Sequence, residues 1–93
     1  MDFEWDDKKS RANLSKHGID FKTATKLWHD ESRVVIEANF PDENRTILIG
    51  KIAEQLWTAI FTYRKKVIRI ISVRHTRKKE INLYEQEKNG QER

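Results

Sequence analysis

Basic side chains are concentrated between residues 64 and 79, where guanidinium groups offer chemistry with phosphate. The interval from Gln55 to Lys79 contains no Asp or Glu. Its basic residues are Arg64, Lys65, Lys66, Arg69, Arg74, Arg77, Lys78 and Lys79. A planar guanidinium binds phosphate oxygens through two parallel hydrogen bonds, and a lysine adds a point charge. With a formal net charge of +4, this distribution predicts a surface for a polyanionic partner.

The same arginines also have a simpler interpretation. In the stretch "VIRIISVRHTRKKE", strand alternation predicts that Arg69 and Arg74 lie on opposite faces of a sheet. The stem of either one can pack while its guanidinium reaches solvent or pairs with a carboxylate such as Glu4 or Glu37. The cations of "HTRKK" stand at an expected helix start, where the helix dipole disfavours positive charge. A bound polyanion would relieve that conflict, so the clustering favours the binding interpretation.

Other side chains give weaker chemical signals. The histidines His17, His29 and His75 show no spacing typical of a metal site, so we expect neither a metal nor another cofactor. His17 stands in the last turn of a predicted helix, where the dipole stabilises an imidazolium. A capping role and a role in proton transfer near neutral pH both remain open for it. The adjacent Asp6 and Asp7 are interpreted as a helix cap.

Length and composition predict one compact, highly charged domain. The chain has 93 residues, 37% hydrophobic and 37% charged, and its three Trp and four Phe argue against disorder. Residues 1–88 form the predicted domain, and residues 89–93 a frayed tail. The sequence has no cysteine, no signal peptide, and no apolar run near the roughly 20 residues of a membrane span. We therefore expect a cytoplasmic protein without membrane contact.

The elements that must position these groups follow the order β, α, α, β, β, β, β, α. The predicted strands cover residues 3–5, 33–40, 45–52, 56–64 and 66–74, with a turn around Pro41. The predicted helices cover residues 7–17, 21–28 and 77–88, with caps at Asp6, Gly18, Asp20 and Thr76. On strand 56–64, the aromatic set of Trp57, Ala59, Phe61 and Tyr63 is the predicted core face. The order predicts an α+β fold with helices packed on an antiparallel sheet.

The sequence also resembles a known family. The segments "FEWD", "NLSKHGIDFKTA", "RTILIG" and "IRIISVRHTRKKEINLYE" together resemble the BrnT family of type II toxin-antitoxin toxins. The resemblance runs from Phe3 to about Tyr84. It implies a RelE-like fold and a metal-independent ribonuclease of the mRNA interferase type, which cleaves RNA, including ribosome-bound mRNA, and inhibits translation. It also implies a BrnA-like antitoxin that neutralises the toxin and binds operator DNA on behalf of the complex.

Metal-free RNA cleavage requires alignment of the 2′-OH, transfer of its proton and stabilisation of the phosphate charge. We predict that Arg64 and Arg74 form the phosphate clamp, from the ends of neighbouring strands. His17 or His75 is the candidate base or acid, and Lys16 and Glu80 are secondary candidates. Further predicted RNA contacts are Arg69, His75, Arg77, Lys78, Lys79 and Trp5.

Two other functions use the same basic stretch, residues 64–79. A non-catalytic module would hold RNA through the same cations without proton transfer. A protein-interaction module would dock an acidic partner, as the toxin itself must dock its antitoxin. The production of new RNA ends separates the ribonuclease from both alternatives.

Overall fold

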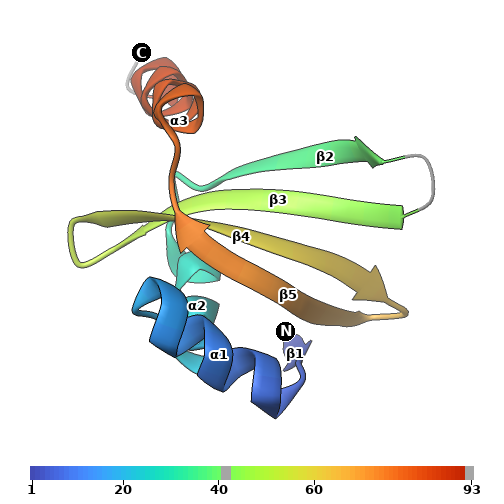
Figure 1. Ribbon diagram of the computed structural model, residues 1–93. Coiled ribbons are helices and arrows are strands. Elements are labelled where there is room, and N and C mark those ends of the chain that lie inside the picture. Colours follow the sequence, from blue (N-terminus) through green and yellow to red (C-terminus); the bar gives the residue numbers. More distant parts are fainter. Residues whose placement is uncertain (41–42, 92–93) are drawn as a thin grey trace.

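The structure, a computed structural model, describes residues 1–40 and 43–91 and shows helices packed on a five-stranded sheet (Figure 1). The strands are β1 (Asp2–Glu4), β2 (Val34–Phe40), β3 (Glu43–Ile52), β4 (Gln55–Arg64) and β5 (Val67–His75). The helices are α1 (Asp7–His17), α2 (Phe21–Ala24), the 3₁₀ helix η1 (Thr25–His29) and α3 (Lys78–Gln91). The predicted α+β order is confirmed, while the turn predicted around Pro41 falls on residues 41–42, outside the described range. No described helix combines the length and apolarity that a bilayer crossing requires.

The sheet is mixed, with the strand order β1-β5-β4-β3-β2. Strands β2 to β5 form the predicted antiparallel meander. β1 runs parallel to β5, with Phe3 opposite Ile68, so the prediction of a wholly antiparallel sheet is wrong. The cause is the long connection after β1, which crosses the sheet through α1, α2 and η1 and enters the opposite edge as β2 (Figure 1). Three reversals then return the chain beside β1 in the same direction.

Local capping signals fix the two N-terminal helices as predicted. Asp6 Oδ1 accepts hydrogen bonds from two backbone N–H groups of the first turn of α1, at 2.8 and 3.2 Å. The helix ends at Gly18, whose φ of 85° lies in the left-handed region that glycine adopts without strain. Asp20 Oδ1 accepts from the N–H of Thr23 at 2.8 Å and begins α2. That hydrogen bond is the main reason that the pKa of Asp20 is lowered.

The apolar stripe of residues 21–28 is confirmed, but the helix is not continuous. The stripe residues Phe21, Ala24, Leu27 and Trp28 are all buried. The α-helix gives way at Thr25 to the 3₁₀ helix η1, whose repeat of three residues suits the apolar spacing. η1 lies very close to β3, because a Cβ on Gly50 would stand 3.2 Å from the Leu27 carbonyl oxygen. A side chain at position 50 would therefore push η1 away from the sheet.

The main core lies between the sheet and the N-terminal helices. Trp57, Ala59 and Phe61 of β4 belong to it as alternation predicts, whereas Tyr63 at the end of the strand is exposed. Trp28 packs edge-to-face against Phe3 and Phe61, with ring centroids 5.0 and 5.1 Å away. Trp5 packs against the same core in a half-buried position.

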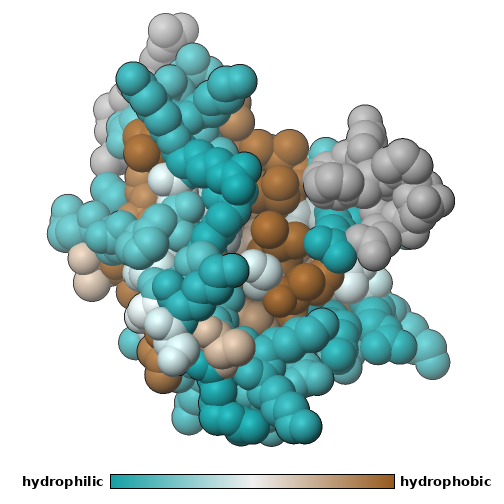
Figure 2. Space-filling view, viewed as in Figure 1, coloured by the Kyte–Doolittle hydropathy of each residue, from teal (hydrophilic) through white to brown (hydrophobic). Residues whose placement is uncertain are grey.

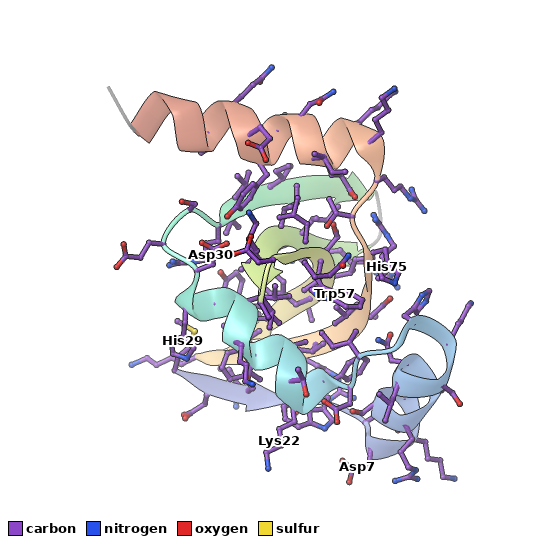
Figure 3. The ribbon with its side chains drawn as sticks, turned by 90° about the vertical axis from the view of Figure 1, so that its left-hand side faces the viewer. Asp7, Lys22, His29, Asp30, Trp57 and His75 are labelled. Carbon is purple, nitrogen blue, oxygen red and sulfur yellow. The ribbon has the colours of Figure 1, made fainter. Side chains whose placement is uncertain are left out.

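The C-terminal helix α3 lies on the opposite side of the sheet from α1 (Figures 1 and 3). Tyr84, only 3% exposed, donates its hydroxyl hydrogen bond to Asp30 Oδ2 at 2.8 Å. Asp30 also accepts from the backbone N–H groups of Ser32 and Lys51. Burial, aided by the hydrogen bond to Asp30, raises the pKa of Tyr84 to about 12. Asp30 therefore ties α3 to the end of η1 and to β3.

α3 begins one residue later than predicted, so Arg77 and not Thr76 occupies the cap position. The N–H of Arg77 donates to Glu80 Oε1 at 2.9 Å, which is the carboxylate half of a capping box. The hydroxyl of Thr76 instead lies 3.1 Å from the hydroxyl of Thr58. The helix continues to Gln91, so the predicted domain boundary at residue 88 falls inside it.

Asn13 of α1 acts as a strand partner for β5. Its side-chain oxygen accepts from the N–H of Val73 at 3.1 Å, and its amide nitrogen donates to the Val73 carbonyl at 2.9 Å. The same nitrogen donates to the carbonyl of Ile19 at 2.8 Å. Because β1 pairs only with residues 67–69, Asn13 satisfies backbone groups further along the β5 edge that would otherwise be buried without partners.

We predict that Asn13→Ala lowers the free energy of unfolding by about 3 kcal/mol, because buried backbone groups that lose their partner cost about 1–3 kcal/mol each. Asn13→Asp keeps the shape but loses both donors, so we expect a comparable loss. Urea denaturation measures both, with Asn82→Ala on the exposed surface of α3 as the control. A loss below about 1 kcal/mol for both Asn13 variants would show that the amide does not hold β5.

Candidate functional site

The sheet face opposite α1 is covered by α3 only at one end. On this face Ile47 pairs with Ile60, and Ile49 pairs with Thr58. Ile49 and Thr58 are fully buried at the end near α3, whereas Ile47 and Ile60 are only partly buried. Figure 2 shows hydrophobic residues gathered in the middle of the view, between α3 and a hydrophilic lower border. An apolar floor is therefore accessible beside the start of α3.

A β-bulge brings two arginines of β5 to this same face. Ile71 is an extra residue on β5, because its two neighbours pair with consecutive residues of β4. Thr62 pairs with Arg69 and Thr58 pairs with Arg74. Both threonines lie on one face of β4, since an even number of residues separates them. The prediction that Arg69 and Arg74 lie on opposite faces is thus wrong, because the bulge shifts the alternation by one residue.

Arg69 lies in a pocket of about 370 Å³, which we call the polar pocket. The pocket is lined by Lys9, Asn44, Arg45, Thr62, Arg69 and Ile71. Its positive charges come from three elements: Lys9 from α1, Arg45 from β3 and Arg69 from β5. Arg69 Nη1 pairs with Glu4 Oε2 at 3.1 Å, as expected, and the two side chains are 32% and 39% exposed. A pair this exposed is weak, so it leaves the guanidinium available to a ligand.

A second pocket of about 340 Å³ adjoins the polar pocket and shares Arg45 with it. We call it the isoleucine pocket. It is lined by Arg45, Ile47, Ile60, Arg74, Arg77 and Glu80. Ile47 and Ile60, which pair across β3 and β4, supply its apolar surface, and charged side chains supply the rest.

Arg74 and Glu80 form an ion pair in the wall of the isoleucine pocket. Their nitrogen and oxygen atoms meet in two parallel contacts of 2.8 Å, and the side chains are only 16% and 14% exposed. Glu80 Oε1 also accepts from the Thr58 hydroxyl at 3.1 Å and from the Arg77 N–H. These hydrogen bonds, that of Arg74 first, lower the pKa of Glu80 from 4.5 to about 2.

The carboxylate of Glu80 is therefore an anion at neutral pH that already accepts four hydrogen bonds, three at Oε1 and one at Oε2. This arrangement suits a group that positions Arg74, and a role for Glu80 as base or acid stays a prediction. The hydrogen bond that Arg74 donates to Glu80 also raises the pKa of Arg74, which stays charged. Three of the five N–H bonds of Arg74 go to Glu80 and to the His75 carbonyl. The other two are available for a phosphate oxygen.

A third pocket, of about 200 Å³, lies against α1 and shares Lys9 and Ile71 with the polar pocket. We call it the helix pocket. It is lined by Lys9, Ala12, Asn13, Lys16, His17, Ile71 and Ser72. It brings the predicted proton-transfer groups Lys16 and His17 beside the bulge and next to the cations of the polar pocket.

The structure brings together six of the predicted site residues around these three pockets: Lys16, His17, Arg69, Arg74, Arg77 and Glu80. Arg64 does not join them. It pairs with Val67 at one end of the β4–β5 hairpin, whereas Arg74 pairs with Thr58 near the other. The intervening residues of β4 span about 20 Å. The prediction that Arg64 and Arg74 form one clamp is therefore wrong. The two arginines lie near the C-terminal ends of antiparallel strands, and these ends are at opposite ends of the hairpin.

The remaining predicted RNA contacts lie outside the three pockets. The His75 ring stacks on Trp57, with centroids 4.4 Å apart and planes at 27° (Figure 3). Lys78 and Lys79 are exposed in the first turn of α3, immediately after the pocket residue Arg77. Contacts from these residues and from the half-buried Trp5 to RNA stay predictions.

Arg45 is the main site residue that the sequence analysis did not select. It lies between the polar and isoleucine pockets, outside the basic stretch of residues 64–79. The sequence contains one signal for this position: Arg45 stands two residues before Ile47 on the same strand, so the two side chains lie on the same face of the sheet. The contributions of Lys9 and Thr62 depend on packing between elements and had no comparable signal.

A hollow of about 580 Å³ lies elsewhere, at the end of the sheet near η1, and is lined by Lys26, His29, Asp30, Ser32, Lys51, Ala53, Glu54 and Tyr84. Cations and carboxylates are mixed in it, and Asp30 is already engaged by Tyr84 and backbone groups. Within residues 1–40 and 43–91, no three His, Asp or Glu side chains are placed to share a metal ion. This hollow therefore offers no chemistry as definite as that of the open sheet face.

Comparison with known proteins gives one family match. A family model described as the ribonuclease toxin BrnT of a type II toxin-antitoxin system matches residues 5–80. That range contains every residue that lines the polar, isoleucine and helix pockets. No curated protein matches the chain.

The Arg74–Glu80 pair predicts how stability depends on pH. The folded pKa of Glu80, about 2, lies below the ordinary 4.5, so the stabilisation is full above pH 4.5 and is lost as the pH falls toward 2. We expect Glu80→Gln to lower the free energy of unfolding at pH 7 by about 2 kcal/mol. The difference from wild type should shrink between pH 4.5 and pH 2 in urea titrations.

The matched control is Glu85→Gln, an exposed position of α3, for which we expect little change at any pH. A Glu80→Gln deficit that stays constant from pH 7 to pH 2 would show that the loss does not come from the ionised pair.

Proposed function

The chain belongs to the BrnT family of ribonuclease toxins of type II toxin-antitoxin systems, and from this we propose that it is a metal-independent endoribonuclease that inhibits translation by cutting mRNA. The observation that best supports the proposal is the group formed by Arg45 on β3 and by Arg69 and Arg74 on β5, which lie on either side of β4 on one open sheet face. Cleavage through the 2′-OH adds negative charge to the phosphate, and fixed guanidinium groups stabilise that charge without reorganising.

We assign phosphate binding to the polar pocket. Lys9, Arg45 and Arg69 surround it from three directions, so a phosphodiester is held by several charge-assisted hydrogen bonds at once. Arg74 contributes its two available N–H groups from the adjoining pocket wall. Glu80 and Thr58 keep the guanidinium of Arg74 in one orientation, which removes the entropy cost of ordering it during the reaction.

The bond changes require one group to remove a proton and another to return one. The 2′-oxygen forms a bond to phosphorus as its proton leaves, and the bond from phosphorus to the 5′-oxygen breaks as that oxygen gains a proton. The products are a 2′,3′-cyclic phosphate and a 5′-hydroxyl. We assign proton transfer to His17, with Lys16 beside it, because both line the helix pocket next to the polar pocket.

The partners follow from the same surface. A RelE-like toxin acts in the cytoplasm on mRNA held by the ribosome, and the ribosome then supplies part of the alignment of the substrate. A BrnA-like antitoxin with acidic side chains complements the cationic face and blocks it, and carries the complex to operator DNA. These partners account for a basic face that is larger than the three pockets, including the exposed Lys78 and Lys79.

The test is cleavage of a mixed-sequence RNA in EDTA, with analysis of the RNA ends. We expect the wild type to leave 2′,3′-cyclic phosphate and 5′-hydroxyl ends. Arg69→Ala and Arg74→Ala should lower the rate about 100-fold or more, as the loss of a charge-stabilising donor does in other enzymes. Arg64→Ala should cost much less, because Arg64 lies at the far end of the hairpin.

The control is Arg11→Ala, an exposed arginine of α1 that lines none of the three pockets. If wild-type protein leaves the RNA intact, the assay is repeated with translating ribosomes. Intact mRNA in both assays, with binding that weakens steeply with salt, would replace the ribonuclease by a non-catalytic RNA-binding module.

A further inference from the structure

We propose that the isoleucine pocket binds one nucleobase of the RNA and that it selects guanine. The proposal rests on the ribonuclease function proposed above, with the phosphate of the same strand held in the polar pocket. The two pockets share Arg45, so a base and a neighbouring phosphate can occupy them together.

The polar pocket has the hydrogen-bond donors that a phosphate requires, whereas the isoleucine pocket has the apolar surface that the face of a base requires. Apart from Ile71, the polar pocket is lined by side chains that donate hydrogen bonds. Ile47 and Ile60 offer no hydrogen bonds and would leave a phosphate unsolvated. They suit the flat face of a base, which loses water when it packs on an aliphatic surface. At about 340 Å³, the pocket is at the small end of ligand sites, which fits a single ring system.

The polar groups of the isoleucine pocket are donors. Arg45, Arg74 and Arg77 present guanidinium N–H groups, which cannot accept hydrogen bonds. Glu80 is the acceptor in the wall, but its oxygens already receive hydrogen bonds from Arg74, Thr58 and the Arg77 backbone. A base in this pocket therefore meets three guanidinium groups and one carboxylate that already accepts four hydrogen bonds, so donors outnumber the acceptor positions left.

A surface of donors selects among the four bases. Guanine presents two adjacent acceptors, O6 and N7, which match a guanidinium fork. Adenine places an amino donor beside N7, and cytosine presents an amino donor, so each would meet the arginines with a like group. Uracil offers O4 without a neighbouring N7. Guanine is the base that such a wall binds best.

Arg77 is the residue assigned to read the base. Arg74 is committed to Glu80 through both terminal nitrogens. The side chain of Arg77 forms no ion pair with any residue that the structure describes, whereas its backbone N–H is fixed by Glu80. The same contact that orients Arg74 thus anchors Arg77 at the rim of the pocket.

The experiment measures binding of pentanucleotides with uracil at four positions and G, A, C or U at the centre. Every 2′-OH is replaced by fluorine, so the RNA cannot be cut through a 2′-oxygen. Fluorescence anisotropy at one fixed salt concentration should show about 10-fold tighter binding with central guanine than with adenine. Replacing guanine by 7-deazaguanine, which lacks the N7 acceptor, should remove most of that difference.

The variants separate base recognition from charge. Arg77→Ala should bring the affinity for the guanine oligomer down to that for adenine, and Arg77→Lys should do the same because it restores the charge without the fork. Arg64→Ala, with the same loss of charge away from the pocket, should weaken all four oligomers equally. Equal affinities for the four bases in the wild type, or a guanine preference that survives in Arg77→Ala, would overturn the proposal.

Failure of this proposal and failure of the ribonuclease proposal give different results. A guanine preference without cleavage of matched natural RNA would support the base pocket and contradict the ribonuclease proposal. Cleavage without base preference would leave the enzyme standing, and would assign the isoleucine floor to an aliphatic side chain of a protein partner.

Discussion

The hydrogen bonding of Asn13 to the backbone of Val73 is the contact on which the site depends. It holds α1 against β5 immediately after the bulge at Ile71, and so places the helix pocket next to the polar pocket. The bulge then determines which side chains of β5 lie on the open face of the sheet. With regular alternation, one of Arg69 and Arg74 would point into a core of aromatic rings, where a guanidinium cannot lose its charge. The cationic surface therefore exists because β5 contains one residue more than its partner strand.

At the start of α3, a carboxylate compensates for the positive charges that the basic stretch places near the N-terminus of the helix. Cations at the start of a helix oppose the helix dipole, and α3 has Arg77 at its cap position and Lys78 and Lys79 in its first turn. The negative charge of Glu80, at position N3 of the helix, compensates for these cations, and its carboxylate accepts the Arg77 N–H. The same carboxylate also binds the guanidinium of Arg74. An acid in this position is thus needed by the helix and by the arginine together. The sequence pattern alone had attributed relief of the conflict to a bound polyanion.

The features that could be predicted from the sequence are local, and the missed ones are not. The caps at Asp6, Gly18 and Asp20 depend on a few adjacent residues, and the meander follows from short turns between β-rich runs. The parallel pairing of β1 depends on where a long connection returns. Nothing in a run of apolar residues distinguishes Ile71 as the extra residue of a bulge. The sequence therefore does not predict that Arg69 and Arg74 lie on the same face of the sheet. Arg45 enters the site only because β3 lies beside β4.

The uncovered apolar floor argues that the open face is shaped for a ligand. A chain of this size and composition has few apolar side chains, and each Å² of apolar surface removed from water is worth about 25 cal/mol. Ile47 and Ile60 nevertheless stay only partly buried between arginines, although Ile49 and Thr58, one step further along the same strands, are fully buried near α3. Stability alone would favour a helix that extends over the whole face. Leaving the isoleucines accessible beside guanidinium groups is useful only if something partly flat, partly apolar and rich in acceptors comes to cover them, and a nucleobase attached to its phosphate has all three properties.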